Sequence, residues 1–228
     1  MFGISRLNTL AKAASAPAGA RSSAATFSQG TTTLPTTGGK FNGYLNAPID
    51  GNAAITSVPA DTTWYTNSNK IWTIEFWMRP STTSFSSASA PVVRSSPANT
   101  GMSLANTGTS GQLGLWLGGT NAYSFSPSTT FTHYAITCDG AGQVSFYLGG
   151  SKVVTNASFA NNYNQRVVNF GLNWNNANGM TWRFDEIRIS NSVRYTATFT
   201  PSASEFTNDA NTLALFHFNG GTAADDTA

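Results

Sequence analysis

The chain has 228 residues, of which 40% are hydrophobic and 10% are charged, whereas about 25% of residues are charged in an average globular protein. The formal net charge is +2, and residues 1–49 hold 4 of the 12 cations and none of the 10 acids, so the remainder is nearly neutral. This balance gives no electrostatic signal for a nucleic acid or an anionic membrane as partner. No apolar run approaches the roughly 20 residues of a membrane span, and the Ser/Thr/Asn/Gly-rich surface is typical of an extracellular or virion β protein.

Residues 1–39 differ in composition from the rest of the chain. Apolar residues at helical spacing predict one short amphipathic helix that ends before Pro17, and a Ser/Thr/Gly-rich extended stretch follows it. We interpret residues 1–39 as an arm that becomes ordered against neighbouring subunits, anchored by Ile4, Arg6, Leu7, Leu10 and Lys12. The Arg-bearing, Ser-rich and acid-free first 25 residues also leave open an organellar transit peptide.

From residue 40 onward the sequence pattern predicts a series of short strands. We interpret residues 40–228 as one domain. After a strand at 53–58, residues 71–78 (IWTIEFWM) form a stronger one. Its alternation puts Trp72, Ile74, Phe76 and Met78 on one face and Ile71, Thr73, Glu75 and Trp77 on the other. Pro80 ends the strand because proline cannot donate to a continuing ladder. Further short strands are predicted at 92–94, 102–104, 113–117 and 122–125.

A hairpin at residues 131–154 is the clearest signal in the sequence. Its apolar residues alternate in both strands, and Asp139 to Gly142 supply the turn. The residues expected on the core-facing side are Tyr134, Ile136, Cys138, Val144, Phe146 and Leu148. Cys138 is the only cysteine, which excludes an intrachain disulfide and a cysteine-based zinc site, and its strand position predicts a buried thiol.

Strands at 167–172 and 180–189 flank the loop 173–179, and a last strand at 213–218 is expected to pair with the segment near Phe41. More than ten short strands with closely spaced turn signals predict an all-β fold. We expect an antiparallel two-sheet jelly-roll sandwich with an extended or short-helical N-terminal arm.

Four segments carry a family resemblance: WTIEFWMRP (72–80), THYAITCDGAGQVSFYLGG (132–150), FDEIRIS (184–190) and LALFHFNG (213–220). In order and spacing the chain resembles the concanavalin A-like lectin/glucanase superfamily, in its laminin G-like or pentraxin-like form, over roughly residues 40 to 220. The segment IRISNSVRYTATFTP (187–201), followed by the terminal LALFHFNG, is most similar to domains of tailed-phage virion proteins.

Hydrolase chemistry has little support in these residues. Glycoside hydrolysis needs two facing carboxylates, and the hydrolases of the superfamily that place both on one strand use a Glu-x-Asp-x-x-Glu spacing that is absent here. Asp185 and Glu186 are neighbours in a strand and are expected on opposite faces, and Glu75 stands alone. His133 and His217 lie in predicted strands, where a half-buried side chain bonded to a neighbour is expected. A glucanase therefore remains only as a third hypothesis.

The resemblance also implies a possible metal, because laminin G-like domains often bind calcium through Asp, Asn and backbone oxygens. Asp185 is the candidate ligand. The alternative is an acid near the inner face of the sheet that is bonded to backbone amides. No other cofactor is predicted.

Sugar binding is chemically possible in two loops. Lectin sites combine an aromatic platform with amide hydrogen-bonding groups, and Trp174 has the neighbours Asn173, Asn175 and Asn176. Tyr163 lies in a second Asn-rich cluster. The alternative for Trp174 is a side chain that only plugs the packing between loops.

Beside the glucanase, these features give two functional hypotheses. The leading one is a non-enzymatic virion structural protein, either a capsid decoration or a tail-fibre component, anchored by its N-terminal arm. Its partners would be other virion proteins, with the chain as a homo-oligomer or in many copies on the particle. The alternative is a glycan-binding host-adhesion module.

Overall fold

The computed structural model describes residues 26–28, 34–47, 53–57, 66–85, 91–95, 101–160, 168–171 and 182–219. In these ranges the regular structure consists of β-strands, so the predicted all-β class is confirmed. No helix in the same ranges is long and apolar enough to cross a membrane. The short helix predicted near the N-terminus lies outside the described residues.

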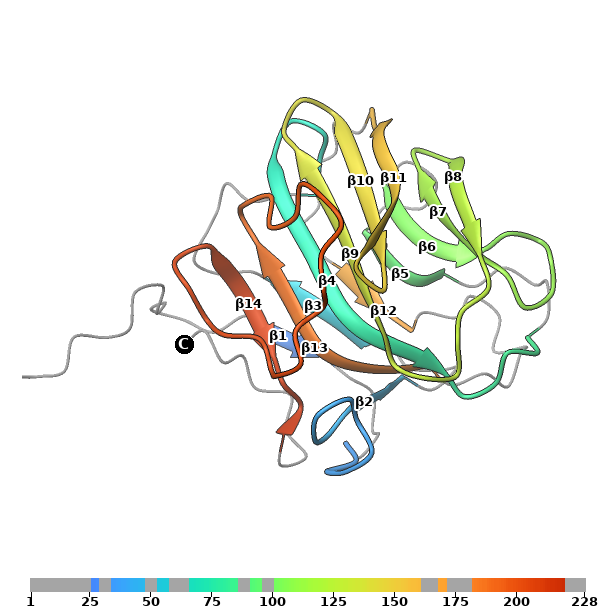
Figure 1. Cartoon of the computed structure of the whole chain (residues 1–228), viewed down its shortest axis with the longest axis vertical. Helices are drawn as coiled ribbons and strands as arrows, with labels where there is room; N and C mark the ends of the chain where they lie inside the picture. Colours follow the sequence, from blue (N-terminus) through green and yellow to red (C-terminus); the bar gives the residue numbers. More distant parts are fainter. Residues whose placement is uncertain are drawn as a thin grey trace, which may run out of the picture.

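Two antiparallel sheets pack face to face (Figure 1). Sheet I has the strand order β1-β3-β12-β5-β6-β7-β8, with the bounds Thr26–Ser28, Ala53–Ser57, Val168–Phe170, Pro91–Ser95, Met102–Asn106, Leu113–Leu117 and Thr120–Phe125. Sheet II has the order β11-β10-β9-β4-β13-β14, with the bounds Ser151–Ser158, Gln143–Leu148, Thr132–Asp139, Ile71–Pro80, Trp182–Ser190 and Thr212–Phe216. Beside this path, β2 (Leu45–Ala47) also pairs with β13. The predicted two-sheet sandwich is confirmed.

The core lies between the sheets and follows the predicted alternation of β4. Trp72, Ile74, Phe76 and Met78 are fully buried in the main hydrophobic cluster. Phe76 stacks on Tyr134 of β9, with ring centroids 5.6 Å apart, and meets Phe170 of sheet I edge-on at 5.8 Å. This aromatic contact joins the two sheets near the middle of the sandwich.

The predicted hairpin is β9–β10. Its turn contains Gly140 and Gly142 at φ +82° and +78°, a region that glycine adopts without strain. The Asp139 carboxylate accepts hydrogen bonds from the backbone N–H groups of Ala141 and Gln143 at 2.8 and 3.0 Å. Cys138 is buried, as predicted.

Two strand pairings differ from expectation. The last strand, β14, pairs with β13 and not with the segment near Phe41; both β2 and β14 use β13 as their partner, at residues 182–184 and 187–190. In addition, β1 lies inside the predicted arm yet pairs with β3, so sheet I includes residues before position 40.

A β-bulge in β13 overturns the predicted placement of two acids. Asp185 pairs with Trp77 and Arg188 pairs with Glu75, so Glu186 and Ile187 together oppose one residue of β4. Glu186 adopts φ +53° at this point. Because the extra residue interrupts the alternation, Asp185 and Glu186 both leave the core side, instead of pointing to opposite faces.

Candidate functional site

The outer face of sheet II is covered by residues 191–211, which connect β13 to β14 and cross the sheet in front of β4 (Figure 1). At the far side of the sheet, the Phe199 N–H donates to the Gly150 carbonyl at 2.9 Å, and the Tyr147 hydroxyl donates to the Tyr195 carbonyl at 2.7 Å. We call this segment the crossing loop. It removes most of this sheet face from solvent contact.

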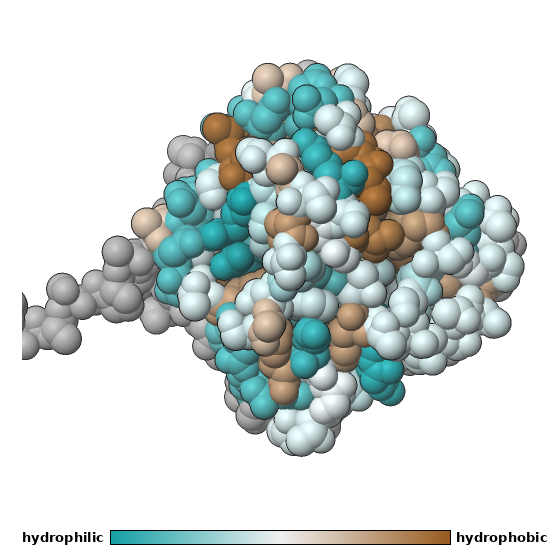
Figure 2. All heavy atoms as spheres, viewed as in Figure 1, coloured by the Kyte–Doolittle hydropathy of each residue, from teal (hydrophilic) through white to brown (hydrophobic). Residues whose placement is uncertain are grey.

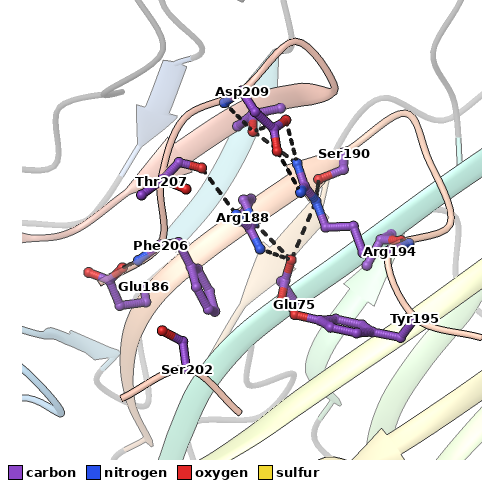
Figure 3. Close-up of polar contacts among 12 residues, drawn as sticks. Glu75, Glu186, Arg188, Ser190, Arg194, Tyr195, Ser202, Phe206, Thr207 and Asp209 are labelled. Atoms are coloured by element: carbon purple, nitrogen blue, oxygen red, sulfur yellow. Dashed lines mark hydrogen bonds and ion pairs between the residues drawn. The ribbon is translucent and has the colours of Figure 1, made fainter. Parts of the chain in front are cut away.

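A buried carboxylate, Glu75, lies beneath the crossing loop (Figure 3). It is bonded to Arg188 at 2.8 Å, to the Tyr195 hydroxyl at 2.6 Å and to His133 Nε2 at 3.2 Å. Burial alone would raise the pKa of Glu75, but the hydrogen bond from His133 and the charge of Arg188 outweigh burial and hold the pKa below its usual value. The acid that stood alone in the sequence is therefore the centre of a closed ion-pair network.

A second ion pair fixes the two ends of the crossing loop to each other. Arg194 donates to both carboxylate oxygens of Asp209 at 2.8 Å, and it also contacts Ser190 (Figure 3). The hydrogen bonds from Arg194 lower the pKa of Asp209 well below its usual range. Bidentate pairs of this kind are the geometrically most specific charge-assisted contacts. The network therefore holds the loop in place and leaves no free acid for catalysis among its members.

Asp185, the candidate calcium ligand, is bonded to backbone amides. Its carboxylate accepts hydrogen bonds from Lys40 at 2.7 Å, Phe41 at 3.1 Å and Glu186 at 2.8 Å. Burial raises the pKa of Asp185 to about 7. N–H groups direct their positive ends at the carboxylate, and in the described ranges no three His, Cys, Asp or Glu side chains are grouped to hold a metal. These residues do not fit a calcium site.

The neighbouring acid, Glu186, also binds other segments. It pairs with His217 Nδ1 at 2.7 Å and accepts a hydrogen bond from the Phe206 N–H at 2.6 Å. His217 is half-buried and His133 is buried, and each contacts a carboxylate. The expectation that both histidines are bonded to neighbours is confirmed.

The predicted sugar-binding loops lie outside the described residues. This applies to Trp174, Asn173, Asn175, Asn176 and Tyr163, and equally to the predicted anchoring side chains Ile4, Arg6, Leu7, Leu10 and Lys12. Both assignments therefore stay predictions.

Sheet I carries a different candidate surface on its outer face. Cross-strand pairing aligns one outward residue from each of five consecutive strands, β12, β5, β6, β7 and β8. We call this the transverse row: Asn169, Arg94, Ser103, Trp116 and Asn121. Asn121 is exposed and the other four side chains are partly exposed. An indole, a guanidinium, two amides and a hydroxyl are thus aligned on one sheet surface.

Trp116 lies between Ser103 and Asn121 in the transverse row. Its Nε1 lies 3.1 Å from the point that a Cβ at Gly114 would occupy, so a side chain there would displace the indole. Nε1 has no hydrogen-bond partner among the described residues. Asn121 holds its amide beside the indole by donating to Ser124 at 2.8 Å and accepting from the Tyr123 N–H at 3.1 Å. This is an aromatic platform with adjacent hydrogen-bonding groups, the combination that sugar sites use.

The sequence carries a signal for this surface in the strand β7. In LGLWL (113–117) the leucines alternate with Gly114 and Trp116, so a large aromatic residue occupies the polar face of a half-buried strand. An aromatic residue on the polar face of a half-buried strand is a candidate for ligand binding.

The comparisons with known proteins agree with the fold. The family model of the concanavalin A-like lectin/glucanases superfamily matches residues 50–198. No curated protein matches the sequence significantly.

Solved structures with the same fold include binding domains of bacterial toxins. The botulinum neurotoxin serotype C1 binding domain superposes with a TM-score of 0.54 at 15% identity, over 74% of this chain and 44% of that one. The binding domain of botulinum neurotoxin DC, in complex with rat synaptotagmin II, gives a TM-score of 0.53, 16% identity and coverages of 74% and 44%. A third structure comes from work on the cell entry of botulinum neurotoxin type C, which depends upon interaction with two ganglioside molecules. It superposes with a TM-score of 0.51 at 14% identity, over 74% of this chain and 43% of that one.

The chain spans less than half the length of these structures, and their low identity supports the fold alone. The family match covers well over half of the chain and includes strands of both sheets. The chain belongs to the concanavalin A-like lectin/glucanases superfamily.

Proposed function

We propose that this protein is a non-enzymatic glycan-binding module and that the transverse row is its binding surface. The observation that carries the proposal is the position of Trp116, a partly exposed indole next to a glycine in a row of polar side chains. The face of an indole packs against the C–H face of a pyranose ring, while Asn121 and Ser103 are placed to bond its hydroxyl groups.

The acids of the described residues support a binding role. Glycoside hydrolysis requires two carboxyl groups on either side of an accessible sugar bond. Glu75, Asp185 and Glu186 are buried, and each is bonded to a cation or to backbone amides. The transverse row itself contains no acid.

The fold neighbours suggest which ligands to test first. One is a neurotoxin whose cell entry depends upon interaction with two ganglioside molecules, and others are toxin binding domains. A host-surface glycan is therefore the first ligand class for this chain.

The proposal also includes where the protein is located. We assign the module to the surface of a tailed-phage particle, as a capsid decoration or tail-fibre component that contacts other virion proteins. The low charge, the N-terminal segment with cations and no acid, and the resemblance of residues 187–201 to virion domains support this assignment. Many copies on one particle would convert modest affinity for each glycan into firm attachment.

The decisive experiment is a glycan array probed with the full chain and with Trp116→Ala. We expect the variant to lose binding by at least about tenfold, because the sugar loses its stacking surface. Its unfolding free energy should change by only about 1 kcal/mol, since the indole is partly exposed.

Two matched variants locate the site. Ile71→Ala removes an exposed apolar side chain from sheet II and should bind as the wild type does. Trp174→Ala tests the predicted loop: loss of binding there, with binding kept in Trp116→Ala, would move the site to residues 173–179. A folded wild-type protein that binds no glycan of the array contradicts the proposed function.

A further inference from the structure

Three cations gather at one end of the outer face of sheet II, beyond the crossing loop. Arg79 of β4 and Arg183 of β13 are direct cross-strand partners, and Lys40 comes from the segment 34–47, whose next strand, β2, pairs with β13. We call these three residues the cationic cluster. At the lower end of the face in Figure 2, where the segment 34–47 lies, strongly hydrophilic and hydrophobic residues are next to each other.

The cationic cluster has no counter-charge. No ion pair within the described ranges includes Lys40, Arg79 or Arg183. Like charges directly opposite each other on adjacent strands destabilise a sheet. Burial and the charge of Arg183 lower the pKa of Arg79.

Aromatic rings hold the cations in place. Lys40 Nζ lies 4.3 Å from the centroid of the Trp77 ring, and Arg79 Cζ lies 5.1 Å from that of Phe131. Arg183 Cζ lies 5.0 Å from the centroid of Tyr44. These contacts order the side chains but leave their charges uncompensated, so the cluster is preorganised for an anion.

Two acids contact the segment 34–47, and both accept hydrogen bonds from uncharged N–H donors there. Asp185 accepts three backbone N–H bonds, and Glu205 accepts bonds from the amides of Asn42 and Asn219 at 2.7 and 2.9 Å. Neither carboxylate forms an ion pair with a cation of the cluster.

A donor and an acceptor without partners lie next to these charges. Arg183 pairs in register with Asn46 of β2. Arg183 Nε and Asn46 Oδ1 are both buried and lack hydrogen-bond partners among the described residues. Arg183 therefore carries a buried Nε that forms no hydrogen bond within the described residues.

We propose that the cationic cluster binds the carboxylate or sulfate group of an acidic saccharide. Two guanidinium groups and one ammonium supply charge-assisted hydrogen bonds to the anion. The saccharide class rests on the proposed function, whereas the anion follows from the cluster itself. The site lies on sheet II and is separate from the transverse row on sheet I.

Calorimetric titration of the full chain with four probes tests this inference. The probes are a heparin octasaccharide, an oligogalacturonate and a neutral malto-oligosaccharide of about the same length, and an octaglutamate peptide. We expect both acidic saccharides to bind, and the double variant Arg79→Gln/Arg183→Gln to lose at least about tenfold in affinity for them. Lys40 is exposed, so Lys40→Gln keeps the fold in any case and should weaken the same binding by about threefold.

The matched control removes two positive charges away from the cluster. Lys70→Gln/Lys152→Gln should bind the acidic saccharides as the wild type does, and an equal loss there would contradict a defined site. Trp116→Ala should leave this binding unchanged. Octaglutamate binding as tightly as the saccharides would assign the cluster to an acidic peptide and overturn the inference.

Failure of this inference differs from failure of the proposed function. If no acidic probe binds while the Trp116-dependent glycan of the array still does, the cationic cluster is not a saccharide site and the transverse row stands. If the acidic saccharides bind and the array result depends only on the cluster, the transverse row fails.

Discussion

At the scale of single residues, the buried acids of this domain attach one segment of chain to another. Glu75 bonds to Tyr195 of the crossing loop, Asp185 bonds to the Lys40 and Phe41 amides, and Glu186 bonds to the Phe206 amide. Removing one partner of a buried ion pair such as Glu75 with Arg188 typically costs about 3 to 5 kcal/mol, because the other charge is left uncompensated. These acids are therefore structural.

Asp185 predicts an unusual dependence of stability on pH. Its pKa is about 7 in the folded chain against an ordinary 3.8, so between these values the folded state binds the proton more strongly than the unfolded state. The stabilisation is complete below about pH 4 and is lost as the pH rises through 7, for a total of about 4 kcal/mol. Urea unfolding at a series of pH values from about 4 to about 8 measures this change in the free energy of unfolding.

The variant Asp185→Asn isolates this contribution, because it cannot titrate. The difference in unfolding free energy between wild type and variant should fall as the pH rises from about 4 to about 8. The lowered pKa values of Glu75 and Asp209 act with the opposite sign and in more acidic solution, where these carboxylates become protonated. A difference that does not vary with pH would contradict the assignment.

At the scale of elements, alternation in the sequence predicts β4, β9 and β10 with the correct core faces, because each strand has one buried side and one covered or polar side. The bulge at Glu186 was not predictable, since a non-glycine residue at positive φ has no local sequence signature. Its position depends on contacts with Phe206 and His217, which are distant in sequence.

The candidate surfaces depend on register, which a single sequence does not reveal. The transverse row combines residues from five strands between positions 94 and 169, and both partners of β12, namely β3 and β5, come from much earlier in the chain. The cationic cluster likewise needs the pairing of β13 with both β2 and β4. Of these residues, Trp116 in its leucine-rich strand carries a signal in the sequence.

The turn between β10 and β11 gives a prediction with an internal control. Gly149 and Gly150 both have positive φ, at +57° and +85°, but only at Gly150 would a Cβ meet backbone, 2.1 Å from the Phe199 carbonyl oxygen. Gly149→Ala should cost about 1 kcal/mol from strain alone. Gly150→Ala should cost at least about 2 kcal/mol more, because the crossing loop must move away from the turn.

Chemical denaturation of the two variants measures this difference. Proteolysis offers a second measurement, since a displaced crossing loop in Gly150→Ala should be cut between residues 191 and 211 more rapidly than in Gly149→Ala. Equal stability of both variants would show that the loop does not depend on close contact at Gly150.

At the scale of the whole molecule, we expect the N-terminal segment to attach the body to its particle. Because β1 begins at Thr26, the informative truncation removes residues 1–24 and leaves sheet I intact. The truncated protein should melt within about 2 °C of the full chain, since it keeps β1 and every other described strand of both sheets, and it should be missing from purified particles. Quantitative mass spectrometry of particles carrying either form decides this, and full occupancy of the truncated form contradicts anchoring.

The pairing of β1 at the border of sheet I also sets the direction in which the domain is presented. Any tether that enters at Thr26 joins the sheet at one border, and β7, which carries Trp116, lies five strand spacings away, or roughly 24 Å. A body held at that border carries Trp116 near the other border of sheet I, away from its own attachment point. A receptor approaching from outside would then meet Trp116 and Asn121 first.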